Sequence, residues 1–371
     1  MQNRLARETL AAWLRPANAK NSQLLPPQPV PETIFAVAER QLILPTISPR
    51  LKSRKIPHDL PSDLGAALPA ITRLNSERNN LIVAQACDVI RILNQAGIEP
   101  VALKGLAYIL AGTLTDPGER FIGDLDLLIP AADIDSAVLA LQTVGYSNLP
   151  VPVPALVQFH YHLLPLRPPA GQRGVLVELH RAVGPPPASA VLPADKLIAE
   201  SRPMQMGSGL KVRIPSPEHL MTHLILHSQI VDQYSHRIWP PLRALDDLQS
   251  LVRRYGAAEI NWQRITNAFH SAGQSSTLNL HLLHAAAEQW LTAPLPIKLG
   301  LLEKLRWRRR RILHHLPKLR YLDPTYWYCA AVRPRLRLTK QLLSTPGGAA
   351  IMAQIALQPS FYLRFLASIL H

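Results

Sequence analysis

The sequence predicts an α/β protein that continues into an all-helical region. Between residues 98 and 183, apolar runs typical of strands alternate with helical patterns in the order strand, helix, strand, helix, strand. From Pro217 to about Trp290 the apolar residues recur at helical spacing throughout. The 371 residues are 47% hydrophobic and 18% charged, which is a globular composition long enough for two or three domains.

The first 65 residues are interpreted as a helical and proline-rich extension. A short helical pattern surrounds Leu5 to Leu14, and the run PPQPVP follows at 26–31. A long helix is predicted from Ala70 to Ala96, because apolar residues return there every three or four positions. Gly97 is the residue expected to end it.

The predicted α/β domain spans residues 66–215. Its elements are a strand in IEPVALKG, a helix in LAYILAGTL, a strand in FIGDLDLLIP, a helix from Asp133 to Gly145 and a strand at 174–183. Asp133 is the expected N-cap of the second helix. A helical domain at 216–295 and a basic helical region at 296–371 complete the predicted organisation.

The charge of the chain is strongly positive. Forty Lys and Arg against 25 Asp and Glu give a net charge of +15, concentrated in RWRRRR at 306–311 and RPRLRLTK at 333–340. This balance predicts attraction to polyanions, so nucleic acid or an acidic protein or peptide is an expected partner of the C-terminal region. A solvated helix face is the alternative interpretation of such basic runs.

Cysteine content and hydropathy predict a cytoplasmic protein. Cys87 and Cys329 are too few for a disulfide framework or a zinc knuckle, and they suit a reducing compartment. No segment reaches the ~20 uncharged apolar residues of a membrane span. The charged N-terminus lacks the apolar core of a secretory signal. Walker A, Rossmann and nucleophile-elbow motifs are absent from the sequence, which disfavours those enzyme classes.

The stretch Gly123-Asp124-Leu125-Asp126 is the most informative for chemistry. On a strand, residues i and i+2 project from one face, so the two carboxylates point together. Like charges held so close are unfavourable unless a cation bridges them, and Mg²⁺ prefers carboxylate oxygens. A solvated strand face is the alternative. If the pair serves a metal, replacing both Asp residues with Asn is not expected to lower stability in metal-free buffer.

Two further positions add to this pattern. Lys104-Gly105 lies between a strand and a helix, where backbone N–H groups and a lysine charge can bind phosphate. Glu178 interrupts the apolar strand VLVELH and could supply a third oxygen ligand or a general base. An ion pair between Glu178 and His180 or Arg181 is the structural alternative.

Taken together, the segments VALKG, RFIGDLDLL and VELH resemble the polymerase-β-type nucleotidyltransferase superfamily. They are similar to the K-G, R-x-x-[SG]-D-x-D-x-L and E-L-H motifs of a group of uncharacterised bacterial nucleotidyltransferases. The first two motifs also look like those of abortive-infection-type nucleotidyltransferases. The resemblance covers about residues 70 to 290 and implies a short mixed sheet flanked by helices, with a helical C-terminal domain.

The resemblance also implies roles for individual residues. The implied catalytic residues and ligands of two Mg²⁺ ions are Asp124, Asp126 and Glu178. The residues implied to contact the nucleotide are Lys104, Gly105, Arg120 and Gly123. The implied reaction transfers a nucleoside monophosphate from a nucleoside triphosphate, with ATP the expected donor, to an acceptor hydroxyl or phosphate, and it releases pyrophosphate.

The acceptor stays open among a protein, an RNA end and a small molecule or peptide. A competing hypothesis is a nucleotidyltransferase-like module that binds nucleotide, RNA or a partner without catalysis. The resemblance further suggests that His227 and either Asp246 or Asp247 line the acceptor side. The histidines that recur every four residues from 219 to 227 are interpreted as core or surface residues, because three ligands on one straight helix converge poorly on one ion.

Overall fold

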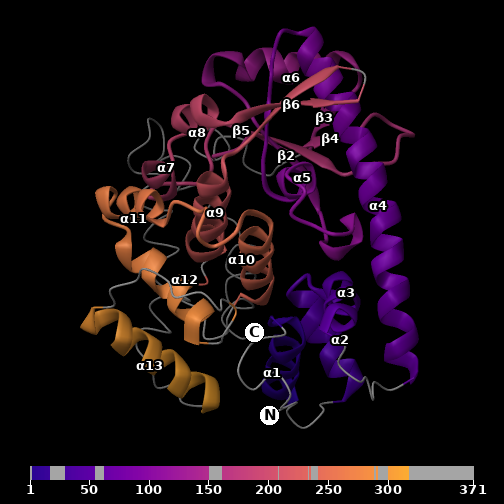
Figure 1. Ribbon diagram of the computed structural model, residues 1–371. Helices are drawn as coiled ribbons and strands as arrows, with labels where there is room; N and C mark the ends of the chain where they lie inside the picture. Colours follow the sequence, from indigo (N-terminus) through magenta and orange to yellow (C-terminus); the bar gives the residue numbers. More distant parts are fainter. Residues whose placement is uncertain are drawn as a thin grey trace, which may run out of the picture. The chain divides into compact units, whose positions relative to one another are not determined.

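The computed structural model describes residues 2–16, 30–54, 62–149, 161–207, 209–232, 234, 241–287, 290 and 300–316 (Figure 1). Residues Met1–Trp307 form one compact unit, and Arg308–His371 form another. The basic run at 333–340 lies outside the described residues. The division of the chain into four predicted parts stays a prediction. The sheet and the site described below belong to the first unit.

A seven-stranded mixed sheet is the centre of this unit, as far as the described residues show, with the order β3-β4-β5-β2-β1-β7-β6. The strands are β1 (Val101–Ala102), β2 (Asp124–Leu128), β3 (Ser147–Asn148), β4 (Leu166–Arg167), β5 (Leu176–His180), β6 (Arg202–Met206) and β7 (Leu210–Ile214). Strand β2 pairs parallel with β5 and antiparallel with β1. The predicted fold class, a mixed sheet accompanied by helices, is confirmed.

Helices make up most of the remaining described residues. They are α1 (Gln2–Leu14), α2 (Pro31–Arg40), α3 (Leu44–Arg54), α4 (Ser62–Gln95), α5 (Lys104–Leu110), α6 (Ile134–Thr143), α7 (Ala188–Val191), α8 (Ala194–Glu200), α9 (Pro217–Leu226), α10 (Leu242–Tyr255), α11 (Trp262–Ser271), α12 (Ser275–Ala287) and α13 (Leu301–His315). Short 3₁₀ turns lie at Pro117–Glu119 and Ala131–Asp133, and a π-helical turn lies at His227–Val231.

Helix α4 connects the sheet to the N-terminal helices. It rises from beside α2 and α3 toward α6 (Figure 1), and it packs against α3 and α6. The sequence pattern predicted that it begins at Ala70, but it begins at Ser62 and contains Pro69. Leu64 and Leu68 are fully buried, so tertiary packing extends the helix through a proline that disfavours it locally.

Two details of the α/β part differ from expectation. Asp133 stands at the N-cap position of α6, but its side chain makes no capping hydrogen bond, because a 3₁₀ turn leads directly into the helix. The β6–β7 hairpin was not predicted. Its second strand, LKVRI, does alternate apolar and polar residues, and its buried positions are Leu210, Val212 and Ile214.

The helical region after the sheet is confirmed in α9 to α12. Helix α10 packs against α9, and α11 and α12 also contact α9. These helices bring the residues after position 217 next to the strands that carry the acidic motif. Within the described part of the chain, no helix is both long and apolar enough to cross a membrane.

Candidate active site

The sheet brings the predicted carboxylates of β2 and β5 onto one face. In the parallel pairing of these strands, Asp126 lies directly opposite Glu178 and Leu128 opposite His180. Asp124 shares the face of Asp126, because it is two residues earlier on the same strand. Strand β5 lies between β4 and β2, so Glu178 is on an interior strand. The alternating apolar residues Leu125 and Leu127 are fully buried.

Lys104 is the cation next to these carboxylates. Its Nζ lies 2.6 Å from Oδ1 of Asp126 and 3.8 Å from Oε2 of Glu178. Burial would lower the pKa of Lys104, but Asp126 and Asp124 outweigh burial and raise it. Lys104 has a positive φ of 44° at the first position of α5, a conformation that a non-glycine residue rarely adopts. Such strain is often kept at functional sites.

His180 is a second partner of Asp126. Its Nε2 lies 2.7 Å from Oδ1 of Asp126 and 3.5 Å from Oε2 of Glu178. Burial opposes protonation, but the hydrogen bonds to these carboxylates raise the pKa of the imidazole. The ligand atoms of Asp126, Glu178 and His180 lie within 4.8 Å of one another, a spacing that could hold a metal ion. His180 follows Glu178 by two residues on β5. The i, i+2 spacing that places Asp124 and Asp126 on one strand face therefore predicts that His180 shares the face of Glu178.

Asp124 lies at the edge of this group and faces an open cavity. It is not among the three residues whose ligand atoms cluster, but it lines the cavity with Lys104. Burial and the charge of Asp126 raise the pKa of Asp124 to about 6. The structure therefore brings Asp124, Asp126 and Glu178 together on one sheet face, with Asp126 at the centre of the polar contacts.

The donor set fits a hard divalent cation. Lys104 and His180 both contact Asp126, while burial and the charge of Asp126 raise the pKa of Asp124, which has no cation so close to it. Carboxylate oxygens are the ligands that Mg²⁺ prefers, while an imidazole nitrogen suits other metals. His180 is therefore better described as a hydrogen-bond partner that holds Asp126 than as a magnesium ligand.

The cavity beside Asp124 has a volume of about 370 Å³. Its lining comes from the N-terminal helices, α5, the strand β2 and the helices α9 and α10. The polar lining residues are Arg40, Gln41, Lys104, Tyr108, Arg120, Asp124, His223, His227, Ser228, Asp232, Tyr234, Arg243 and Asp247. The cavity is large enough for a small ligand and carries charges of both signs.

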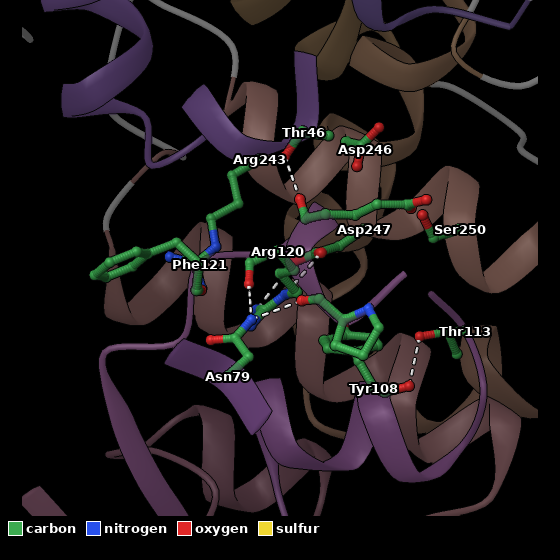
Figure 2. A network of polar contacts seen from close by, with 12 residues as sticks. Thr46, Asn79, Tyr108, Thr113, Arg120, Phe121, Arg243, Asp246, Asp247 and Ser250 are labelled. Atoms are coloured by element: carbon green, nitrogen blue, oxygen red, sulfur yellow. Dashed lines mark hydrogen bonds and ion pairs between the residues drawn. The ribbon is translucent and has the colours of Figure 1, made fainter. Parts of the chain in front are cut away.

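Arg120, predicted to contact nucleotide, is held by a buried ion pair. Its Nε and Nη2 donate to the two carboxylate oxygens of Asp247 at 2.9 and 3.1 Å (Figure 2). The guanidinium also lies over the ring of Tyr108, 4.8 Å from its centroid. Burial would lower the pKa of Arg120, but Asp247 outweighs it and raises that pKa. Arg120 thus joins the segment before β2 to α10 and presents an already paired charge to the cavity.

Side chains from the surrounding helices fix the segment 117–122. Asn79 of α4 donates to the carbonyl oxygens of Pro117 and Arg120 at 2.6 and 2.7 Å (Figure 2). Thr46 donates to the carbonyl of Glu119 at 2.7 Å. These bonds satisfy buried carbonyl groups that have no strand partner and hold the approach to the acidic motif in one conformation.

A second buried arginine extends this network to the N-terminal helices. Arg50 of α3 donates to both oxygens of Asp246 at 2.8 and 3.1 Å and to Glu119 at 3.1 Å. Its Nη2 also donates to Ser250 at 3.1 Å. Asp246 is therefore occupied by Arg50, whereas its neighbour Asp247 lines the cavity.

The two predicted glycines differ in their surroundings. A Cβ on Gly105 would lie 2.8 Å from Cγ1 of Ile122 and 2.9 Å from Nη1 of Arg120. A Cβ on Gly123 would meet only the ring of Phe121, at 3.7 Å. Gly105 is thus required for the close packing of α5 under the segment before β2, while Gly123 is exposed and leaves open space.

Arg243 is a cavity residue that the sequence analysis missed. Its Nη2 donates to the carbonyl of Phe121 at 3.0 Å, and within the described ranges no carboxylate forms an ion pair with it. Burial and the nearby Arg120 lower the pKa of Arg243 to about 10, so it still carries its charge at neutral pH. It belongs to no motif, and only the packing of α10 against the segment before β2 places it here.

The regularly spaced histidines separate into two kinds of position. Nε2 of His219 lies 3.0 Å from Oε2 of Glu200, and His219 is not a lining residue of the cavity. His223 and His227 line the cavity, with ring centroids 6.2 Å apart. Burial and His227 lower the pKa of His223 well below its ordinary value, so it is neutral at physiological pH. His219 therefore has a different environment from His223 and His227.

No curated protein matches the chain. Among solved structures, the solution structure of the antibiotic-resistance factor ANT(2'')-Ia is similar to 56% of this chain over 99% of its own length, with 14% identity and a TM-score of 0.34. A family described as uncharacterised nucleotidyltransferase matches residues 28–291. This match covers most of the chain and all of the site, so the protein belongs to that nucleotidyltransferase family.

Proposed function

We propose that this protein transfers a nucleoside monophosphate from a nucleoside triphosphate, with ATP as the donor, to an acceptor, and that the reaction depends on Mg²⁺ and releases pyrophosphate. The observation that carries the proposal is the register of β2 and β5, which sets Asp126 against Glu178 with Asp124 on the same face. Lys104 and His180 already pair with Asp126, but Asp124 has no such close cation; a divalent ion would compensate its charge, and nucleotidyl transfer needs such an ion.

Asp124, Asp126 and Glu178 are the residues that would hold Mg²⁺, in one or two ions. When bound, Mg²⁺ would neutralise the phosphate oxygens and the developing charge on the leaving pyrophosphate. His180 donates to Asp126 at 2.7 Å and thereby keeps that carboxylate in one orientation. Partners of this kind fix the orientation of ligating oxygens, and losing them lowers metal affinity or activity.

Lys104 and Arg243 are the cations that would bind the phosphates. Both line the cavity next to Asp124, and Arg243 has no carboxylate partner among the described residues. Lys104 can turn its flexible side chain from Asp126 toward a phosphate once the negative charge of the site is compensated. Arg120 would act by holding the segment before β2, since Asp247 occupies the Nε–Nη2 edge of its guanidinium.

The two glycines would serve the nucleotide in different ways. Gly105 allows Arg120 and Ile122 to pack against α5, which supports the position of the acidic strand. Gly123 adds no side chain beside Asp124, which leaves room for a phosphate that shares a cation with that carboxylate. The proposal therefore keeps both residues in the site, the first through packing and the second through access.

Nucleotide binding tests this function through thermal melting. A ligand that binds only the folded state stabilises by about 2.7 kcal/mol at 100 times its Kd, which is a rise of roughly 3–4 °C for a chain of this size. We expect MgCl₂ with ATP to raise the melting temperature, and ATP with EDTA to leave it unchanged. Asp126→Asn should abolish the rise, while Asp88→Asn, at an exposed position on α4, should keep it.

Catalysis is tested separately with α-labelled ATP and a cell lysate as the source of acceptors. Label on a product together with released pyrophosphate is expected from the parent and not from Asp126→Asn. A protein that shows the Mg²⁺-dependent rise but transfers no label and releases no pyrophosphate would be the non-catalytic nucleotide-binding module. An equal rise in EDTA would contradict the role of the metal.

A further inference from the structure

Transfer to a hydroxyl group requires a base, and the structure does not offer Glu178 for that task. Its Oε2 lies 3.5 Å from Nε2 of His180, 3.8 Å from Nζ of Lys104 and 4.0 Å from Nε2 of His162. Its carboxylate therefore faces the nitrogen atoms of three basic side chains. Glu178 is also absent from the lining of the cavity, where an acceptor would enter. A base for the acceptor must therefore come from another residue of the lining.

His227 is placed for this role by an unusual piece of backbone. Helix α9 ends in a π-helical turn at His227–Val231, and the N–H of Asp232 donates to the carbonyl of His227 at 2.8 Å. This i+5 bond replaces the i+4 bond of an α-helix and brings residue 232 alongside residue 227. Single π-helical turns are rare and are frequently found at functional sites.

The turn sets a carboxylate against one nitrogen of the imidazole. Oδ2 of Asp232 lies 3.3 Å from Nδ1 of His227. A carboxylate beside Nδ1 favours a proton on that nitrogen and leaves the lone pair on Nε2, which is the arrangement of a histidine base. Both residues line the cavity that also contains Lys104 and Asp124. The side chain of His227 is partly exposed, so a ligand can reach it.

Other groups in the lining fit the role less well. His223 is almost fully buried, and its Nε2 has no hydrogen-bond partner and no exposure to the cavity solvent. Asp124 belongs to the carboxylate group that would hold Mg²⁺, which removes it from proton transfer. His227 is therefore the lining residue that combines access with an orienting carboxylate.

Building on the proposed function, we infer that His227, oriented by Asp232, is the base that deprotonates the acceptor, and that the acceptor is a hydroxyl group. A phosphate acceptor is already ionised at neutral pH and would need no such base. In the step, Nε2 of His227 takes the proton of R–OH, and the acceptor oxygen bonds to the α-phosphorus. The bond from the α-phosphorus to the bridging oxygen breaks, pyrophosphate leaves with that electron pair, and the imidazolium later releases its proton to water.

The test uses the full chain with α-labelled ATP, MgCl₂ and two acceptor probes, glycerol and inorganic phosphate. Labelled glycerol adduct or AMP is expected from the parent. His227→Ala should lose about 10²–10⁴-fold in kcat with an unchanged KM for ATP, and added imidazole should restore part of the rate. Asp232→Asn should lower kcat about 10-fold without changing KM. His270→Ala, at an exposed position on α11, is the matched control and should match the parent.

The possible outcomes separate this inference from the proposed function. A parental rate in His227→Ala, or transfer to phosphate but to neither glycerol nor water, overturns the inference. A parent protein that binds Mg²⁺–ATP but forms neither glycerol adduct nor AMP also overturns the inference. A protein with its own base is expected to deprotonate water and to hydrolyse ATP slowly to AMP. Loss of the Mg²⁺–ATP-dependent melting rise in His227→Ala would show that His227 supports the nucleotide site instead. Absence of that rise in the parent contradicts the proposed function itself.

Discussion

At the scale of single residues, Asp124 and Asp126 are chemically identical and two positions apart, yet their pKa values shift in opposite directions. Burial raises the pKa of both, but Lys104 and His180 overcome it for Asp126 and lower its pKa well below the ordinary value. Asp124 lacks such close partners, and its pKa rises to about 6. Because the sequence pattern treats the two aspartates as equivalent, it could not predict that one stabilises the fold and the other opposes it.

Because the pKa values of the two aspartates shift in opposite directions, the effect on stability is predicted separately for Asp124→Asn and for Asp126→Asn. These two predictions replace the single one for the double substitution. The folded-state pKa of Asp124 lies above its unfolded value, so its ionisation destabilises the fold. That penalty is absent below about pH 4 and complete above about pH 6. In EDTA we expect Asp124→Asn to be more stable than the parent by about 1–3 kcal/mol at pH 7.5 and equally stable at pH 4. Urea unfolding at both pH values measures the difference.

Asp126→Asn provides the contrast for the same experiment. It removes the anion between Lys104 and His180 and leaves buried donors without their charged partner. Breaking a buried ion pair from one side costs about 3–5 kcal/mol. A stabilised Asp126→Asn, or an Asp124→Asn variant that is less stable than the parent at pH 7.5, would contradict the charge balance described for this site.

At the scale of elements, the position of the acidic strand depends on the contact between α5 and the segment before β2. Gly105→Ala would force a Cβ against Ile122 and against Arg120, whose guanidinium is fixed by Asp247. Overpacking of this kind costs about 1–3 kcal/mol. Gly123→Ala meets no such contact and is the matched control.

The expected result for this pair of variants is a lower urea midpoint for Gly105→Ala and an unchanged midpoint for Gly123→Ala. The rise in melting temperature caused by Mg²⁺ and ATP should be smaller in Gly105→Ala. The new methyl group displaces Arg120 and Ile122, and this displacement moves the start of β2. Equal urea midpoints for the two variants would show that the segment before β2 can move aside without a loss of stability.

Sequence patterns predicted the strands and helices that carry the motifs but not the contacts that hold them. The strands around Asp126 and Glu178 were recognisable because apolar residues flank each acidic group. The bonds of Asn79 to the segment 117–122 were not recognisable, since their partners are about forty residues away in the chain. Arg243 and the π-helical turn were missed for the same reason, because both depend on how helices pack rather than on local spacing.

At the scale of the whole molecule, the site and the excess of basic residues occupy different parts of the chain. Every residue of the site lies within 28–291, the range that matches the family. The basic runs at 306–311 and 333–340 follow that range. Nucleotide chemistry and polyanion binding should therefore be separable by shortening the chain.

A chain that ends at Gly300 tests this separation. It keeps the sheet, the helices α1 to α12 and the fully buried Trp290, so we expect cooperative melting and an unchanged Mg²⁺–ATP-dependent rise. Its affinity for single-stranded RNA should fall and depend less steeply on salt, because each lost phosphate contact removes a released counterion from binding. Filter binding at several salt concentrations measures this slope. RNA affinity that survives the truncation would place the polyanion surface on the family-matched part, and loss of the melting rise would mean that residues after 300 support the nucleotide site.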